Sequence, residues 1–199
     1  MQYTTKHSNP VARFCAAGLH MVPIPKVNGQ PSKAPMSKGW NKPISENNQG
    51  GYSANGDDFI DCEGFNFGLY HDASQTLALD LDDLKLASQV IEETTGAKLS
   101  DWLNDEARAE IKSPKANRAK LLFKLPAGFK NAGLRQFKRD KEVVFELRSG
   151  NCQDVVYGQH PEGGQYQFIG DPAIIPSAPA ELLDFLQHWD EWKPCFDSS

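Results

Sequence analysis

The stretch Thr76-Leu77-Ala78-Leu79-Asp80-Leu81-Asp82-Asp83 alternates apolar side chains with carboxylates. Successive side chains on a β-strand point to opposite faces, so this alternation predicts a strand with its leucines on one face and Asp80 and Asp82 on the other. The two Cα atoms would lie about 6.6 Å apart, where like charges without a partner are costly. A divalent cation removes that cost, and carboxylate oxygens suit Mg²⁺ or Mn²⁺. An exposed edge strand with hydrated acids is the alternative interpretation.

Composition bounds the classes of protein to consider. With 199 residues, the chain can form one substantial core, or a main domain with a small appendage. Its mean hydropathy is −0.54, and it has no apolar run of the roughly 18 residues that span a bilayer. The first ten residues lack the apolar stretch of a secretory signal, so we expect a cytoplasmic protein without membrane contact. A net charge of −5 argues against coating nucleic acid by bulk attraction, but it is compatible with a local basic channel.

Periodicity along the rest of the chain predicts an α+β domain with a mixed, largely antiparallel sheet flanked by helices. Two β-hairpins are expected, one joining residues 65–70 to 76–82 and the other joining 143–148 to 154–157. Further strands are expected at 20–24, 110–112, 119–125 and 166–169. Helices are expected at 9–18, 84–93 and 179–192, the last capped by Ser177.

A further acid interrupts an apolar strand in Val143-Val144-Phe145-Glu146-Leu147-Arg148. Burial of an unpaired carboxylate is costly, so Glu146 either pairs with Arg148 or another cation, or binds a metal ion. In the predicted strand 119–125 and just before it, Arg118 and Lys120 share one face. Guanidinium and ammonium groups both suit phosphate oxygens. A hydrated basic surface is the alternative explanation for the cations between residues 112 and 148.

The order and spacing of these motifs resemble the bifunctional DNA primase/polymerase domain of the archaeo-eukaryotic primase superfamily, which is common in replication proteins of plasmids, phages and other mobile elements. The resemblance covers about residues 9–172. It is carried by Lys33-Ala34-Pro35 with Lys38-Gly39-Trp40, by Asn66-Phe67-Gly68-Leu69 ahead of Leu79-Asp80-Leu81-Asp82, by residues 113–123, and by Phe145-Glu146-Leu147-Arg148 followed by His160-Pro161.

The resemblance implies an archaeo-eukaryotic primase-like fold that includes an RRM-like catalytic half. Residues 1–175 would form the primase/polymerase catalytic domain, and 176–199 a C-terminal helix and tail packed on the domain or leading out of it. It implies template-directed nucleotidyl transfer, as primer synthesis and/or DNA polymerisation, with two Mg²⁺ or Mn²⁺ ions held by Asp80, Asp82 and Glu146. The implied partners are a single-stranded DNA template, NTP or dNTP, and a replicative helicase, fused or separate. The implied nucleotide-binding residues are Ser113, Arg118, Lys120, Arg148 and His160, with Lys33 and Lys38 as contacts to template or nucleotide.

The chain departs from the family pattern at three places. Lys120 stands where His is usual, Tyr157-Gly158-Gln159 replaces the usual Pro-Pro-Ser before His-Pro, and Glu146 stands where Asp is frequent. These departures motivate a second hypothesis, a nucleic-acid-binding replication module without catalysis. A metal-dependent nuclease that uses the same acids is a third hypothesis. His160 is equally explained as a turn histidine beside Pro161, and no motif fixes a preference for ribonucleotides, deoxynucleotides or a template sequence.

Overall fold

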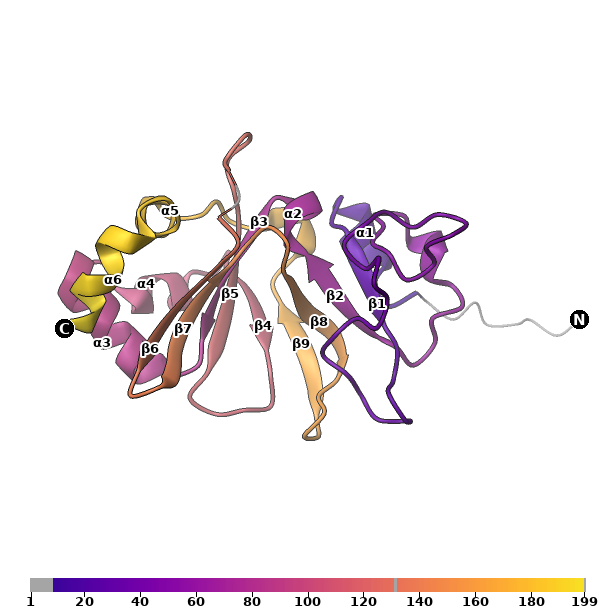
Figure 1. The fold of residues 1–199 in the computed structure, drawn as a ribbon, viewed down its shortest axis with the longest axis horizontal. Coiled ribbons are helices and arrows are strands. Elements are labelled where there is room, and N and C mark those ends of the chain that lie inside the picture. Colours follow the sequence, from indigo (N-terminus) through magenta and orange to yellow (C-terminus); the bar gives the residue numbers. More distant parts are fainter. Residues whose placement is uncertain (1–8, 131, 199) are drawn as a thin grey trace, which may run out of the picture.

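The computed structural model describes residues 9–130 and 132–198, which form an α+β structure around a nine-stranded sheet (Figure 1). The strand order is β1-β2-β8-β9-β4-β5-β3-β7-β6. Every pair of neighbouring strands is antiparallel. The expected α+β class is thus confirmed, with a sheet that is antiparallel between these strands and not mixed. The strands are β1 Met21–Ile24, β2 Asn66–Tyr70, β3 Thr76–Leu81, β4 Ala109–Lys112, β5 Ala119–Lys124, β6 Leu134–Arg139, β7 Glu142–Arg148, β8 Gln153–Gln159 and β9 Gln165–Ile169.

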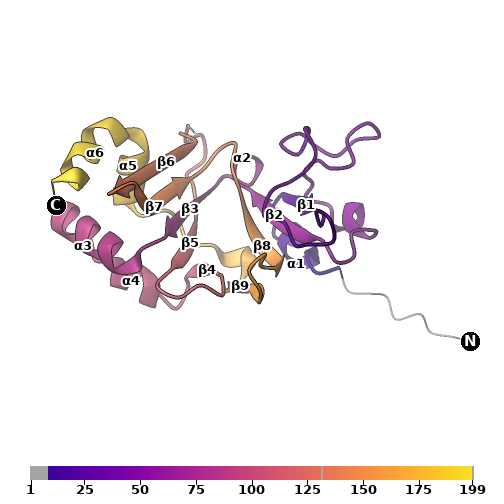
Figure 2. The same ribbon diagram turned by 60° about the horizontal axis from the view of Figure 1, so that its bottom comes forward.

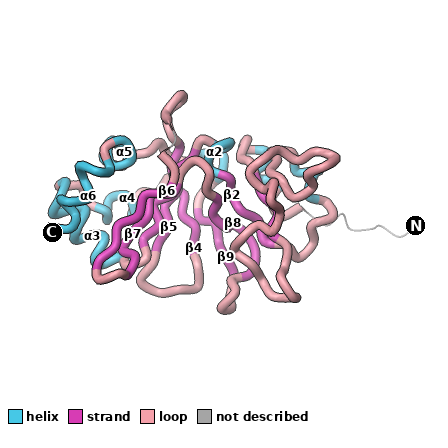
Figure 3. The backbone as a smooth tube through the Cα atoms, in the orientation of Figure 1, coloured by secondary structure: helices cyan, strands magenta, loops and turns pink. Residues whose placement is uncertain are grey.

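Helices gather mainly at one end of the sheet, and long loops lie at the other (Figure 3). Among the described residues, no helix has the length and apolar character needed to cross a bilayer. The helical elements are α1 Ala12–Ala16, α2 His71–Ser74, α3 Leu84–Thr95, α4 Leu99–Asn104, α5 Ala180–Gln187 and α6 Trp189–Asp197, with 3₁₀ turns η1 Gly56–Phe59 and η2 Pro172–Ile174.

Both hairpins predicted from the sequence are wrong, although all four segments form strands. Strand β2 pairs with β1 and β8, whereas β3 pairs with β5 and β7. Between them, α2 carries the chain from one half of the sheet to the other. Strand β7 pairs with β3 and with β6, which the sequence analysis missed, while β8 lies beside β2 and β9. A period of two identifies a strand and its faces, but packing of distant segments selects the neighbours.

The predicted helix 84–93 is confirmed and extends to Thr95. The Asp83 side chain accepts a hydrogen bond from the Leu86 backbone N–H at 3.0 Å, and Gly96 ends the helix in the left-handed conformation. The predicted helix 179–192 is instead two helices, α5 and α6, that meet at His188. Ser177 is not its cap, because the chain around Ser177 pairs with the end of β5 before the helix begins.

One hydrophobic core lies between one face of β3, β5 and β7 and the helices α3 to α6. The three leucines of β3 are fully buried here, as the alternation predicted, and they share this core with Phe145 and Phe196. Figure 2 shows these helices together at the end of the molecule opposite α1 and β1. The C-terminal helices therefore support the strands that carry the predicted site residues.

A second core packs on the other face of the same strands. Ala78 of β3 and Leu122 of β5 join α1, β1, β2, β8 and β9 in it, with Phe14 and Phe168 in edge-to-face contact at 5.0 Å. Because side chains two residues apart share a face, Asp80 lies next to Ala78 and Lys120 next to Leu122. The polar side chains are thus placed at the border of a packed core, on the face of the strands away from α3 to α6.

Candidate nucleotide and metal site

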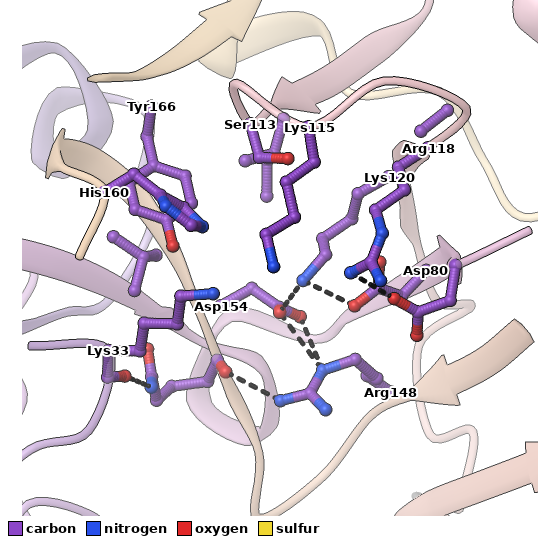
Figure 4. Close-up of a pocket in the computed structure, with 15 residues that line it drawn as sticks. Lys33, Asp80, Ser113, Lys115, Arg118, Lys120, Arg148, Asp154, His160 and Tyr166 are labelled. Carbon is purple, nitrogen blue, oxygen red and sulfur yellow. Dashed lines mark hydrogen bonds and ion pairs between the residues drawn. The ribbon is translucent and has the colours of Figure 1, made fainter. Parts of the chain in front are cut away.

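A pocket with a volume of about 280 Å³ lies over the central strands (Figure 4). Eight of the ten site residues predicted from the sequence line it, and Glu146 and Lys38 do not. The predicted residues that line it are Lys33, Asp80, Asp82, Ser113, Arg118, Lys120, Arg148 and His160. Side chains from β3, β5, β7 and β8 meet here with the turn before β5 and the loop after β1.

Strand register places Asp80 at the centre of a charged row. Asp80 lies opposite Lys120 of β5 on one side and opposite Glu146 of β7 on the other. The Lys120 ammonium binds the Asp80 carboxylate at 2.8 Å, and the Arg118 guanidinium binds Asp82 at 2.6 Å. The acids and cations that the alternation placed on one face therefore contact each other directly.

Glu146 belongs to this row, but its carboxylate is buried by contacts with two neighbouring side chains. Arg148 donates a hydrogen bond to one of its carboxylate oxygens at 2.8 Å, and Gln136 donates to the other. Its side chain is only 11% exposed. The structure thus shows the ion pair that the sequence analysis considered for Glu146. Lys38 is exposed in the loop between β1 and β2 and lies outside the pocket lining.

Asp154 is a charged pocket residue that the sequence analysis missed. Its buried carboxylate, on β8, accepts hydrogen bonds from Lys120, from His71 Nε2 at 2.8 Å and from Arg148 Nε at 3.1 Å. A weaker signal than that of Glu146 is present, because Asp154 directly precedes the apolar residues Val155 and Val156 in the strand expected at 154–157. It could have identified this residue.

Burial and the contacts among Asp80, Lys120 and Asp154 shift the pKa values of all three groups. Burial raises the pKa of the Asp80 carboxyl, although Lys120 opposes that shift. Burial alone would also raise the pKa of Asp154, but Lys120, the His71 hydrogen bond and Arg148 hold it well below its ordinary value. Burial alone would lower the pKa of Lys120, whereas Asp154 and Asp80 together raise it. Lys120 is therefore a fixed positive charge at neutral pH.

Cations and two aromatic rings form the opposite wall of the pocket. Lys33 and Lys115 direct their ammonium groups into the pocket (Figure 4), and Lys115 also pairs with Glu162 at 2.7 Å. His160 packs against Tyr166 with ring centroids 5.3 Å apart. Burial, with Lys33 nearby, lowers the pKa of His160, and burial raises the pKa of Tyr166 to about 12. A neutral imidazole and a neutral phenol thus face the ammonium groups at neutral pH.

His160 has the turn role that the sequence analysis considered. Its Nδ1 accepts a hydrogen bond from the backbone N–H of Glu162 at 3.1 Å. Its ring also lines the pocket. The two roles are compatible, because the turn contact fixes the ring in a pocket wall.

A divalent ion in this pocket would need several oxygen ligands. Within residues 9–130 and 132–198, no three His, Cys, Asp or Glu side chains form a ready metal cluster. The carboxylates of Asp80 and Asp82 nevertheless open into the pocket, and carboxylate oxygens are the ligands that Mg²⁺ and Mn²⁺ prefer. Each of these acids currently binds an ammonium or guanidinium group. The residues fit such an ion by their chemistry, provided that these ion pairs open.

Comparison with known proteins agrees with this picture. A search of curated proteins found no significant match. A family model described as "Bifunctional DNA primase/polymerase, N-terminal" matches residues 12–182, from α1 into α5, and this range contains every residue that lines the pocket. The chain therefore belongs to the bifunctional DNA primase/polymerase family, a family of nucleotidyltransferases.

Proposed function

We propose that the pocket over β3, β5 and β7 is the active site for template-directed nucleotidyl transfer, in which the protein synthesises primers and/or extends DNA. Family membership implies primase/polymerase activity on DNA with nucleotide substrates. The observation that supports this site is the meeting of Asp80 and Asp82 with Arg118, Lys120 and Arg148 in one pocket. Acids that suit divalent ions and cations that suit phosphates are both needed for this reaction.

In this proposal, Asp80, Asp82 and Glu146 hold two Mg²⁺ or Mn²⁺ ions. Such ions, when bound, lower the pKa of the attacking hydroxyl and neutralise the triphosphate and the departing pyrophosphate. Glu146 reaches this role only when it exchanges its contacts with Arg148 and Gln136, because these two residues now occupy its two carboxylate oxygens.

The cationic side chains bind the triphosphate. Arg118 and Arg148 offer forked donors, and Lys120 offers a point charge fixed between two carboxylates. Ser113 and neutral His160 add hydrogen bonds, and Lys33 contacts the template or nucleotide from the opposite wall. Lys38 contacts the template outside the pocket.

We further propose that the part of the sheet around β3, β5 and β7 is the RRM-like catalytic half of an archaeo-eukaryotic primase-like fold. Residues 1–175 would form the catalytic domain, and the segment 176–199 would pack on it or lead out of it. Replication of a plasmid or phage in the cytoplasm, with a single-stranded DNA template and a replicative helicase, is the context that the family suggests.

The test is incorporation of labelled NTP or dNTP with Mg²⁺ or Mn²⁺, both by primer extension and by dinucleotide synthesis without a primer. The double variant Asp80→Asn, Asp82→Asn should lose both activities. A matched control is Asp190→Asn, Glu191→Gln, which removes two exposed acids of α6 and should retain them. Full activity of the Asp80, Asp82 variant would show that this mechanism is wrong.

The two other hypotheses give different results in the same experiment. A nuclease would cut labelled single-stranded DNA in the presence of metal without nucleotides. A module without catalysis would bind single strands in a salt-dependent way but incorporate nothing. The observation that favours this second candidate is that the acids are already paired with cations.

A further inference from the structure

Two cations in the pocket each bind a pair of carboxylates. Lys120 binds Asp80 at 2.8 Å and also binds Asp154. Arg148 binds Glu146 at 2.8 Å and Asp154 at 3.1 Å. In both cases, one partner is an acid assigned above to metal binding, and the other partner is Asp154. Figure 4 shows the Lys120 ammonium between the carboxylates of Asp80 and Asp154, with Arg148 reaching Asp154 from another side.

We infer that Asp154 is a positioning residue that retains Lys120 and Arg148 in the pocket when Asp80 and Glu146 exchange these cations for divalent metal ions. The inference rests on the proposed function. Within the part of the chain that the structure describes, loss of Asp154 would leave Lys120 paired with Asp80 and Arg148 paired with Glu146. A metal ion would then have to displace each cation from its remaining carboxylate. With Asp154 present, a cation that leaves its metal-binding acid keeps a second carboxylate.

Burial and hydrogen bonds hold the Asp154 carboxylate in one position. Its side chain is only 3% exposed, compared with 20% for Asp80. His71 holds one carboxylate oxygen and is itself held by Thr76 Oγ1 at 2.9 Å and, through its backbone N–H, by the Cys152 carbonyl at 3.0 Å. The position of Asp154 is therefore fixed by contacts with residues that do not line the pocket.

The strand that carries Asp154 also supports the positioning role, because it is not paired with the strands that carry Asp80 and Glu146. Asp154 belongs to β8, which pairs with β2 and β9, while the metal-binding acids belong to β3 and β7. A movement of Asp80 toward a metal ion does not require a movement of Asp154. Lys120 can thus leave Asp80, and Arg148 can leave Glu146, while both keep their contact with Asp154. Both cations then stay in the pocket, where a triphosphate can reach them.

The first experiment measures Mn²⁺ binding to the nucleotide-free protein, by the electron paramagnetic resonance signal of free Mn²⁺. We expect Asp154→Asn to weaken binding by about 10-fold or more, because hydrogen bonds to charged groups are strong and the released cations then compete for Asp80 and Glu146. The matched control is Glu110→Gln. Glu110 is a buried acid of β4 that pairs with Arg108 at 3.1 Å and lies outside the pocket lining, so binding should be unchanged.

A double-mutant cycle separates positioning from a simple loss of negative charge. If Asp154 acts through Lys120, the effect of Asp154→Asn should shrink by several-fold in a Lys120→Met background. An identical effect in both backgrounds overturns the inference. Equal Mn²⁺ binding by the wild type and Asp154→Asn also overturns it but leaves the proposed metal site intact. Absence of binding by the wild type overturns both.

A second measurement uses the wild-type protein, in case Asp154→Asn does not fold. In a crystal structure with Mg²⁺ or Mn²⁺ bound to Asp80, Lys120 and Arg148 should remain within hydrogen-bond distance of Asp154 after leaving Asp80 and Glu146. Lys120 turned away from Asp154, or a metal ion coordinated by Asp154 itself, would overturn the inference.

Discussion

Arg118→Met should separate the contribution of the pocket to activity from its contribution to stability. Arg118 lies just before β5 and binds Asp82 at 2.6 Å, with 41% of its side chain exposed. Exposed ion pairs of this kind contribute about 0–1 kcal/mol to the free energy of unfolding, because water screens them and the side chains lose entropy. The substitution should therefore lower that free energy by less than about 1 kcal/mol.

The same guanidinium lines the pocket in which the proposed function places the triphosphate. Hydrogen bonds to charged groups are worth about 1.5–3 kcal/mol, and every 1.4 kcal/mol is about tenfold in an equilibrium or rate ratio. Loss of the Arg118 contacts to phosphate should thus reduce kcat/KM for the incoming nucleotide by about 10- to 150-fold. A large kinetic effect with a small stability effect is the expected combination.

Steady-state primer extension over a range of nucleotide concentrations measures the first quantity, and urea unfolding measures the second. Arg13→Met is a matched control, because Arg13 is an exposed arginine that stacks on Phe14 and Phe168 outside the pocket. Its kcat/KM should equal that of the wild type. A change of less than twofold for Arg118→Met, or a stability loss above about 2 kcal/mol, would refute the reasoning.

Three further predictions concern the acids and the core. Asp80→Asn should reduce incorporation by about 10²–10³-fold or more while the circular dichroism spectrum is retained, since burial raises the pKa of Asp80 and its surroundings therefore tolerate a neutral side chain. The pKa of Asp154 is lower in the folded protein than its unfolded value of 3.8, so its stabilising contribution is present above that value and is lost as the pH falls below it. Urea unfolding across acidic pH should show this decline, and Asp154→Asn should make it shallower; an equal slope would contradict the assignment. Phe196→Ala should cost about 3–5 kcal/mol, because Phe196 is fully buried against Phe137 and Phe145 with ring centroids 5.6 and 5.4 Å away. The exposed Ile174→Ala is its control in urea unfolding, with an expected change below about 0.5 kcal/mol.

Side-chain periodicity predicted the faces of the central strands but not their neighbours. The leucines of β3 and the aspartates between them separate into core and pocket as expected, because that separation depends only on the local alternation. Pairing of β2 with β8 and of β3 with β5 depends on contacts between distant segments, which no local pattern encodes. Strand β6 was missed because Phe137 is its only buried residue, so the strand shows no alternation.

The candidate site was predictable where function and periodicity coincide in one strand. Asp80, Lys120 and Arg148 follow from alternation, and register then brings them together. Lys115 and Tyr166 come from a turn and from β9, where no sequence pattern marks them as parts of the same pocket. The covering of Glu146 by Gln136 depends on β6, so missing that strand also concealed this contact.

The ion pairs of the pocket connect the fold with the proposed chemistry. Asp80 lies beside the second core, where an unpaired carboxylate would be costly, and the Lys120 ammonium supplies the missing positive charge. A divalent ion on Asp80 would supply the same charge and release Lys120 from that contact. The released ammonium is then available to phosphate, while Asp154 keeps it in place. Metal binding and nucleotide binding should therefore favour each other, and by linkage each should increase the affinity for the other by the same factor.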